Sequence, residues 1–437
     1  MANKILRFEP GGRHAERRQD KPREMPMPEP VRDDPDIVEH PALQPQKKSG
    51  PRVSKAVYKI LLVLLAAALT LIIMENYESL TAGNIGNWIR TKAVGLGFGD
   101  GYPVDLIGSV AEPGNFGADE DSVYVVSDTA LTVLNGSAKE IFSVRHSYNN
   151  PAVSAAGDRY LLYNAGGTGY QINTAAGTEL DETADCDITA AAIAASGKFA
   201  LALQPADFAA ELRVFLKNGT EQYSYKFADT YISAVALNAD GTRGAVASIT
   251  SRKGALVSHI TVLDFSKTEP IAQYESEGNM IFDLLWSAAN RVIAIGDTQT
   301  VVSNARFEFE AYDYGGREVT AMCKTNKYAA VSVSNYAYGG NSTLLVFEND
   351  AVPTETELPG RAEWLSCVGE TAAALLPNMV VTVDVGFGKL EAGCDITADT
   401  KGIALGSESA VYLMGVREIR KENLKVLRNT EELFQTN

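Results

Sequence analysis

From about residue 104 onward, the chain repeats one pattern of apolar and polar positions. An apolar strand leads into a short turn of small and polar residues, and a second strand rich in Ala, Val and Leu follows. The clearest copies read AVSAAGDRYLLYN (152–164), AAIAASGKFALAL (191–203), AVALNADGTRGAVAS (234–248), LLWSAANRVIAIG (284–296) and AMCKTNKYAAVSV (321–333). Short strands separated by turn residues at regular intervals predict an all-β domain.

The spacing of the copies indicates which all-β architecture to expect. The turns lie near residues 119, 157, 197, 241, 289, 325, 369 and 401. A period of about 40 residues is typical of the four-stranded blades of a β-propeller. We therefore predict a β-propeller over 104–420 with eight blades; seven is the alternative because the first copy is the weakest. Inner strands pass close to a narrow axis, which explains the small side chains of Ala190–Ala195.

The two ends of the propeller are expected to pair with each other. The last copy shows strands near 395–399, 402–407 and 410–416 but no clear fourth strand. The segment VDLIGSVA (104–111) precedes the first copy and has no partner within it. This segment is predicted to complete the last blade and close the ring.

A continuous apolar run precedes the propeller. Residues 56–74 read AVYKILLVLLAAALTLIIM, and Lys59 is their one charged residue. At about 1.5 Å per residue the run approaches the ~30 Å hydrocarbon core of a bilayer, so we predict an uncleaved transmembrane helix. Lys47, Lys48, Arg52 and Lys55 crowd its N-terminal side, which places the N-terminus in the cytoplasm and the C-terminal domain outside the cell.

The segments around the membrane helix and at the end of the chain have no repeat. Residues 1–55 contain 9 of the 17 prolines and few large apolar residues, so a disordered cytoplasmic tail is expected. Residues 75–103 are predicted to form a juxtamembrane stalk, and residues 421–437 a C-terminal tail.

Charge and cysteine content exclude several kinds of site. The chain has a formal net charge of −16, and residues 75–437 hold 46 Asp/Glu against 26 Lys/Arg. So acidic a domain would be repelled by phosphate backbones, which argues against nucleic acid as a partner. Cys186, Cys323, Cys367 and Cys394 have no zinc-type spacing. Cys323 and Cys367 occupy matching places in consecutive copies; buried free thiols are favoured there over a disulfide.

The copies resemble blades of the broad WD40-like and quinoprotein-like propeller superfamily, although the Trp-Asp blade ending and the Gly-Trp docking pattern are missing. The layout, together with the stalk stretch NWIRTKAVGLGFGDGYPVD, also resembles an uncharacterised family of Gram-positive bacterial membrane proteins. In that family a basic tail and one membrane helix precede a propeller-like domain of unknown function. The resemblance implies a cell-envelope protein and supplies no catalytic residues.

Candidate chemistry in the ectodomain is sparse. Its two histidines, His146 and His259, are about three blades apart, and the acids on predicted inner strands are few. These acids are Asp187, Asp283, Glu363 and Asp395. We predict no catalytic residues, no cofactor and no metal.

Two pairs of residues are candidates for ligand binding. Asp187 and Asp395 share the phrase CDIT and are interpreted either as strand-entry caps or as carboxylates at the channel mouth that bind a cation or a basic ligand. Tyr336 and Tyr338 lie in the Gly-rich loop NYAYGGNST, where aromatic side chains suit protein or glycan contacts.

The sequence therefore favours a membrane-anchored binding or scaffold module without catalytic activity. Its expected partners are the lipid bilayer and a protein or an envelope polymer. The alternatives are an extracytoplasmic propeller enzyme, either a hydrolase or a quinone-dependent oxidoreductase, and a transmembrane sensor.

The topology prediction is testable on intact cells. Protease added outside should remove residues beyond about 80 and spare an N-terminal epitope, because the positive flank of the membrane helix stays in the cytoplasm. Immunoblots against both ends of the chain measure the outcome, with lysed cells as the control. Protection of the C-terminal domain in intact cells would overturn the predicted orientation.

Overall fold

The computed structural model describes residues 97–109, 111–119 and 122–427. These residues form antiparallel β-sheets joined by turns, which confirms the all-β prediction for this part of the chain. Among them no helix is long and apolar enough to cross a membrane. The predicted tail and membrane helix (1–74) and most of the predicted stalk lie outside the described residues.

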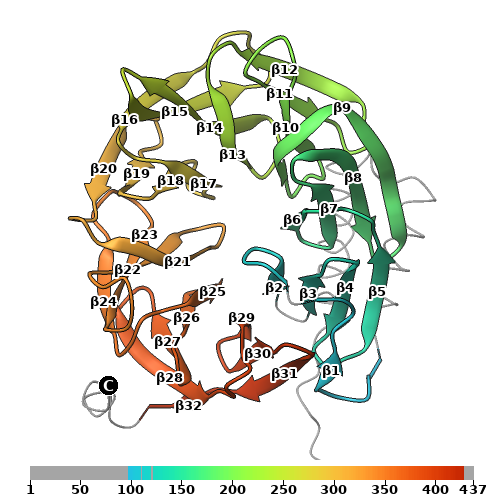
Figure 1. Ribbon diagram of the computed structural model, residues 1–437, viewed down its shortest axis with the longest axis vertical. Coiled ribbons are helices and arrows are strands. Elements are labelled where there is room, and N and C mark those ends of the chain that lie inside the picture. The colour runs from blue at the N-terminus through green and yellow to red at the C-terminus, as the bar shows by residue number, and fades with distance from the viewer. Residues whose placement is uncertain (1–96, 110, 120–121, 428–437) are drawn as a thin grey trace, which may run out of the picture. The chain divides into compact units, whose positions relative to one another are not determined.

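Consecutive strands pair side by side, and the sheets follow one another around a ring (Figure 1). The strands of the first half are β2 (Phe116–Asp119), β3 (Ser122–Val126), β4 (Ala130–Asn135), β5 (Glu140–Arg145), β6 (Pro151–Ala156), β7 (Arg159–Asn164), β8 (Gly167–Thr174), β9 (Gly177–Ile193), β10 (Phe199–Gln204), β11 (Ala210–Phe215), β12 (Glu221–Phe227), β13 (Tyr231–Leu237), β14 (Arg243–Arg252), β15 (Ala255–Asp264) and β16 (Ala272–Glu277). In each sheet the first strand of the repeat lies innermost.

The second half of the chain continues the same order. Its strands are β17 (Ile281–Trp286), β18 (Val292–Gly296), β19 (Gln299–Ser303), β20 (Phe309–Asp313), β21 (Glu318–Lys324), β22 (Ala329–Ser334), β23 (Ser342–Phe347), β24 (Thr354–Leu358), β25 (Trp364–Val368), β26 (Thr371–Leu375), β27 (Met379–Asp384), β28 (Lys389–Asp395), β29 (Gly402–Ser407), β30 (Ala410–Met414), β31 (Glu418–Asn423) and β32 (Lys425–Val426). Strand pairing thus continues past residue 420, into the predicted C-terminal tail.

Strand β9 belongs to two successive sets of four strands. Its first half, Gly177–Thr183, pairs with β8, and its second half, Asp187–Ile193, pairs with β10. The two sets therefore form one continuous seven-stranded sheet, β6 to β12. The other sheets have four strands each, except that β32 adds a fifth to β25–β28.

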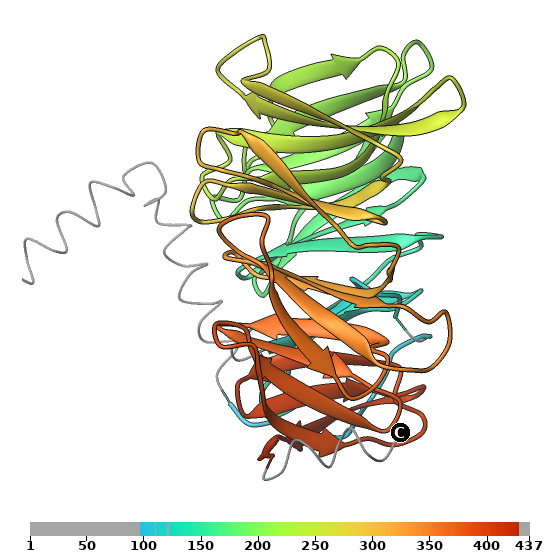
Figure 2. The ribbon, with the colours of Figure 1, turned by 90° about the vertical axis from the view of Figure 1, so that its left-hand side faces the viewer.

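The core lies between neighbouring sheets. Ala245 and Ala247 on β14, for example, pack against Ile281 and Trp286 on β17. Small side chains on one sheet and large ones on the next fill the space between them, so each sheet buries its faces only against its neighbours. Figure 2 shows the succession of sheets from the side.

The ring is closed by a strand from the N-terminal side, as predicted. Val104 and Asp105 form β1, which pairs with Ile419 and Glu418 of β31, and Leu106 N donates to Arg417 O at 2.8 Å. The pairing is shorter than the predicted strand over 104–111. Of the predicted strands of the last copy, 402–407 and 410–416 are confirmed as β29 and β30, but 395–399 does not form the inner strand of this sheet. The edge that β1 covers belongs to β31, which was not predicted.

Tyr102 strengthens this closure by contacting both ends of the ring. Its ring lies 5.3 Å from that of Tyr412 on β30, and its hydroxyl donates to Asn135 O at the end of β4. Lys421 Nζ reaches in the opposite direction and donates to Gly136 O at 2.8 Å. The first and last sheets are therefore joined by side chains as well as by the β1–β31 ladder.

Replacement of Leu106 by Pro should weaken the closure more than replacement by Ala. Both variants lose the packing of the half-buried side chain, but only Pro also removes the N–H that bonds Arg417 O. The expected extra loss is about 1 kcal/mol in the free energy of unfolding, measured by denaturant titration. Equal stability of the two variants would show that the ladder at β1 does not hold the ring together.

Candidate functional site: the central cavity

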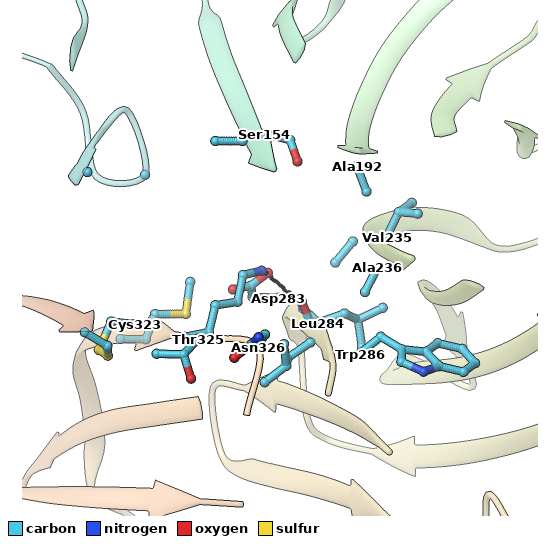
Figure 3. Close-up of a pocket in the computed structure, with 18 of the residues that line it drawn as sticks. Ser154, Ala192, Val235, Ala236, Asp283, Leu284, Trp286, Cys323, Thr325 and Asn326 are labelled. Atoms are coloured by element: carbon cyan, nitrogen blue, oxygen red, sulfur yellow. Dashed lines mark hydrogen bonds and ion pairs between the residues drawn. A yellow bond between two sulfur atoms is a disulfide. The ribbon is translucent and has the colours of Figure 1, made fainter. Parts of the chain in front are cut away.

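The inner strands surround a cavity of about 1200 Å³. It is lined mainly by β2, β6, the second half of β9, β13, β17, β21 and β25. Figure 3 shows one side of it, with Ser154 and Ala192 across the space from Asp283 and Asn326. The volume exceeds the roughly 300–1,000 Å³ that small-molecule sites in proteins usually enclose.

Small side chains make up much of the wall, as the alanine run predicted. All six residues of 190–195, including Ile193, line the cavity. Ala234 and Ala236 continue this surface on β13. Ala190, Ala192 and Ala194 are buried. Because alanine carries no polar atom beyond its backbone, these stretches of the wall present no polar side chain to the cavity.

Serine hydroxyls connect neighbouring inner strands around the cavity. Ile193 N donates to Ser154 Oγ at 3.2 Å, Ser233 Oγ donates to Ile281 O at 2.7 Å, and Leu405 N donates to Ser366 Oγ at 2.8 Å. Each bond joins the inner strands of two adjacent four-strand sets. These hydroxyls satisfy backbone groups that the sheet ladders leave unpaired, and they do so without introducing charge.

An ion pair performs the same connection between β17 and β21. Lys324 Nζ lies 2.5 Å from Asp283 Oδ1 and donates to Leu284 O at 2.8 Å. Asp283 Oδ1 also accepts the Leu284 N–H at 2.8 Å. The Asp283 side chain is 20% exposed and that of Lys324 40%, so both charges face the cavity. Asp283 was among the predicted inner-strand acids; Lys324 was not singled out.

A disulfide joins the next two inner strands. Cys323 on β21 and Cys367 on β25 are bonded, with their Cα atoms 6.0 Å apart, and both line the cavity. The expectation of free thiols at these matching positions was therefore wrong, because adjacent inner strands approach within bonding distance. Cys186 and Cys394 are free, and burial raises the pKa of the Cys394 thiol to about 11.

The predicted carboxylate pair lies elsewhere. Asp187 is exposed in the middle of β9, where the strand passes from one four-strand set to the next, and Asp395 is exposed at the end of β28. β28 is the outer strand of its repeat, so Asp395 is not on an inner strand as predicted. Neither side chain lines the central cavity, and their role as ligands stays a prediction.

The predicted aromatic pair lies at the tip of the β22–β23 hairpin. Tyr336 is 59% exposed and Tyr338 94% exposed. Arg361 Nη1 donates to Tyr336 O, which fixes the base of the tip to the segment between β24 and β25. Both tyrosines are therefore presented to solvent on a hairpin whose base is anchored.

His146 and His259 are not among the residues that line the cavity. His146, after β5, stacks on Tyr148 with ring centroids 5.3 Å apart, and burial lowers its pKa. His259 on β15 lies 3.9 Å from Glu275. Over the described ranges, no group of three or more His, Cys, Asp and Glu side chains is arranged to hold a metal ion.

Comparisons with known proteins identify the fold. The model of a family described as "Family of unknown function (DUF5711)" matches residues 117–354. A search of curated proteins finds no match. The ring is similar to the computationally designed Ika8 protein, with 12% identity and a TM-score of 0.53 over 73% of this chain and 98% of that one.

Two natural proteins are also found by the comparison of structures. The C-terminal WD40 domain of Sif2 has 10% identity and a TM-score of 0.50 over 75% of this chain and 97% of its own. BamB from Moraxella catarrhalis has 10% identity and a TM-score of 0.47 over 74% and 100%. At such low identity the likeness to Ika8 and to the Sif2 WD40 domain shows the fold alone: the described residues form a β-propeller.

Reduction of the disulfide should destabilise the propeller. The bond closes a loop with a sequence separation of 44, and constraining such a loop in the unfolded chain is worth about 4 kcal/mol. We expect dithiothreitol to lower the free energy of unfolding by up to this amount in the natural protein, as measured by denaturant titration. Cys323→Ser should reproduce the loss and abolish the effect of the reductant, whereas Cys394→Ser should leave that effect intact. An unchanged midpoint on reduction would contradict the bond.

Proposed function

Because this chain belongs to the DUF5711 family of unknown function, we propose its function from its β-propeller fold and its surface. We propose a membrane-anchored, extracytoplasmic propeller of eight blades that binds a partner in the cell envelope and does not catalyse a reaction. The partner is a protein or an envelope polymer, and the predicted helix over 56–74 holds the propeller at the membrane.

The proposed number of blades follows from how β9 is used. Because β9 is the outer strand for β6–β8 and the inner strand for β10–β12, the seven-stranded sheet counts as two blades. The strands β29–β31 form the last blade when β1 is added to them. Together with the five other sheets, this gives eight.

The disulfide supports the proposed location outside the cell. Bonds of this kind form and persist in oxidising compartments and are rare in the cytosol. Cys323 and Cys367 belong to the domain that the positive flank of the apolar run assigns to the outside. Two independent features, one from flanking charge and one from cysteine pairing, thus favour the same side of the membrane.

The presentation of Tyr336 and Tyr338 is the observation that carries the binding role. A Cβ at Gly340 would lie 2.5 Å from Tyr336 Cδ2, so the tyrosine ring rests directly on the glycine backbone. Gly339 and Gly340 have φ of +64° and +69°, which shape the tip. Exposed aromatic side chains held in place on a rigid scaffold bind at low entropic cost, since little order is lost on contact.

Site-specific photo-crosslinking tests this role in cells. A benzophenone amino acid at position 338 should give one discrete cross-linked species, detected by immunoblotting. The matched control is position 387, because Phe387 is also exposed, at 77%, in the turn between β27 and β28. Position 338 lies in the turn between the second and third strands of its sheet, and position 387 in the turn between the third and fourth strands of its own. In an antiparallel sheet these two turns lie at opposite ends of the strands, so the control probes the other end.

The outcomes distinguish specific binding at this tip from non-specific cross-linking. A species at 338 that is lost on Tyr336→Ala supports binding at this tip, and its sensitivity to protease or to wall hydrolases tells a protein from a polymer. No species at 338, or equal species at 338 and 387, would contradict the proposal.

A further inference from the structure

The charged pair Asp283–Lys324 departs from the pattern of the inner strands. In β13, β17 and β21 the register of pairing shifts once near the start of the strand, and the residue directly after the shift is Ala234, Asp283 and Ala321, respectively. The positions are therefore structurally equivalent. Two of these strands place alanine where β17 places a carboxylate.

The lysine departs from the same pattern at the other end of the strand. The last paired residues of these three inner strands are Leu237, Trp286 and Lys324. All three line the cavity, but only β21 ends on a charge. Asp283 thus stands where the other two strands have alanine, and Lys324 stands where they have a large apolar residue. The two charged side chains meet in the cavity.

Connection of adjacent strands does not require this charge. Serine hydroxyls make the corresponding connections at Ser154, Ser233 and Ser366. Taking two charges partly out of water carries a desolvation cost that neutral groups avoid. The pair is therefore better explained by what it presents to the cavity than by what it contributes to the ring.

Each partner keeps hydrogen-bonding capacity that the described part of the chain does not use. An ammonium group has three N–H donors, and Lys324 uses two, toward Asp283 Oδ1 and Leu284 O. The described hydrogen bonds of Asp283 involve Oδ1, so within the described chain Oδ2 accepts none. Because Lys324 Nζ lies 2.5 Å from Asp283 Oδ1, the remaining donor and the remaining carboxylate oxygen belong to neighbouring groups on the cavity wall. Asp283 lies across the space from Ala192 (Figure 3).

We propose that the central cavity binds a small zwitterion of the α-amino acid class. The ligand's carboxylate accepts from Lys324, its ammonium donates to Asp283 Oδ2, and its side chain lies toward the alanine wall. An α-amino acid carries both charges on one carbon, which matches the close spacing of the two protein groups. A net anion or cation would satisfy only one of them. This site is independent of the partner surface at Tyr336 and Tyr338.

The test uses the full-length protein in detergent and the free α-amino acids as probes, one at a time. At least one should raise the melting temperature saturably and bind in isothermal titration calorimetry, since a ligand that binds only the folded state stabilises it. Its N-acetyl and carboxamide derivatives, which each lack one charge, should bind at least about tenfold more weakly.

The decisive variant is the double change Asp283→Ala/Lys324→Leu, which installs the residues that β13 has at the same positions. Since β13 folds with Ala234 and Leu237, this variant should keep its melting temperature without ligand and lose binding by at least about tenfold. Lys327→Met is the matched control. Lys327 also bonds an acid of the adjacent sheet, Glu370, but it lies outside the cavity lining, so binding should be unchanged.

If the double variant does not fold, Lys324→Arg serves in its place, because it keeps the charge but not the shape of the donor; it should fold and bind measurably more weakly. Failure of every amino acid to bind the natural protein would overturn the proposal. Equal binding by the variants, or equal binding of the singly charged derivatives, would overturn it as well.

Discussion

Each sheet of the ring can bury both faces only if it has a neighbour on either side, so the pairing of β1 with β31 determines whether the first and last sheets are protected. Without β1, the edge of β31 would expose unpaired backbone groups. Tyr102 adds to the ladder by packing on Tyr412 while bonding Asn135 O, so that one side chain contacts both ends of the propeller. The positions of all inner strands, and therefore the shape of the cavity, follow from this closure.

The wall of the cavity is held by a set of connections that differ in chemistry. Serine hydroxyls join three pairs of adjacent inner strands, a disulfide joins β21 to β25, and an ion pair joins β17 to β21. Two of these connections, the ion pair and the disulfide, are consecutive and share β21. The chemically distinct part of the cavity thus spans three neighbouring strands, β17, β21 and β25, with β21 contributing to both connections.

Much of this arrangement could be predicted from the sequence, because a period of about 40 residues and alternating strands specify a propeller wherever they occur. Closure by the segment at 104 was also predictable, since the last copy lacked a fourth strand. The repeated phrase CDIT led to a wrong prediction for Asp395. Asp395 ends the outer strand β28, whereas Asp187 lies in β9, a strand that belongs to two sets of four strands.

The pairing of Cys323 with Cys367 and the role of Lys324 could not be derived in the same way. The repeat placed both cysteines at matching positions, but the choice between thiols and a disulfide depends on a separation between strands that periodicity does not give. The difference between Lys324 and the apolar residues of the other inner strands is seen only when the strands are aligned by their register shifts. The bulge adds one residue to each strand, and the sequence does not show where that residue lies.

The closing ladder also bears on how the chain reaches its folded state. Val104 pairs with Ile419, and nearly the whole sequence of the propeller lies between these two residues. Almost all other paired strands are neighbours in sequence. Contacts between distant residues form late, because the entropy of the intervening chain opposes them. The sheets can assemble one after another as the chain emerges, but β1 has to wait for β31. During that interval the partly built propeller has two open edges, and a second copy of the chain could supply the missing strand to either of them.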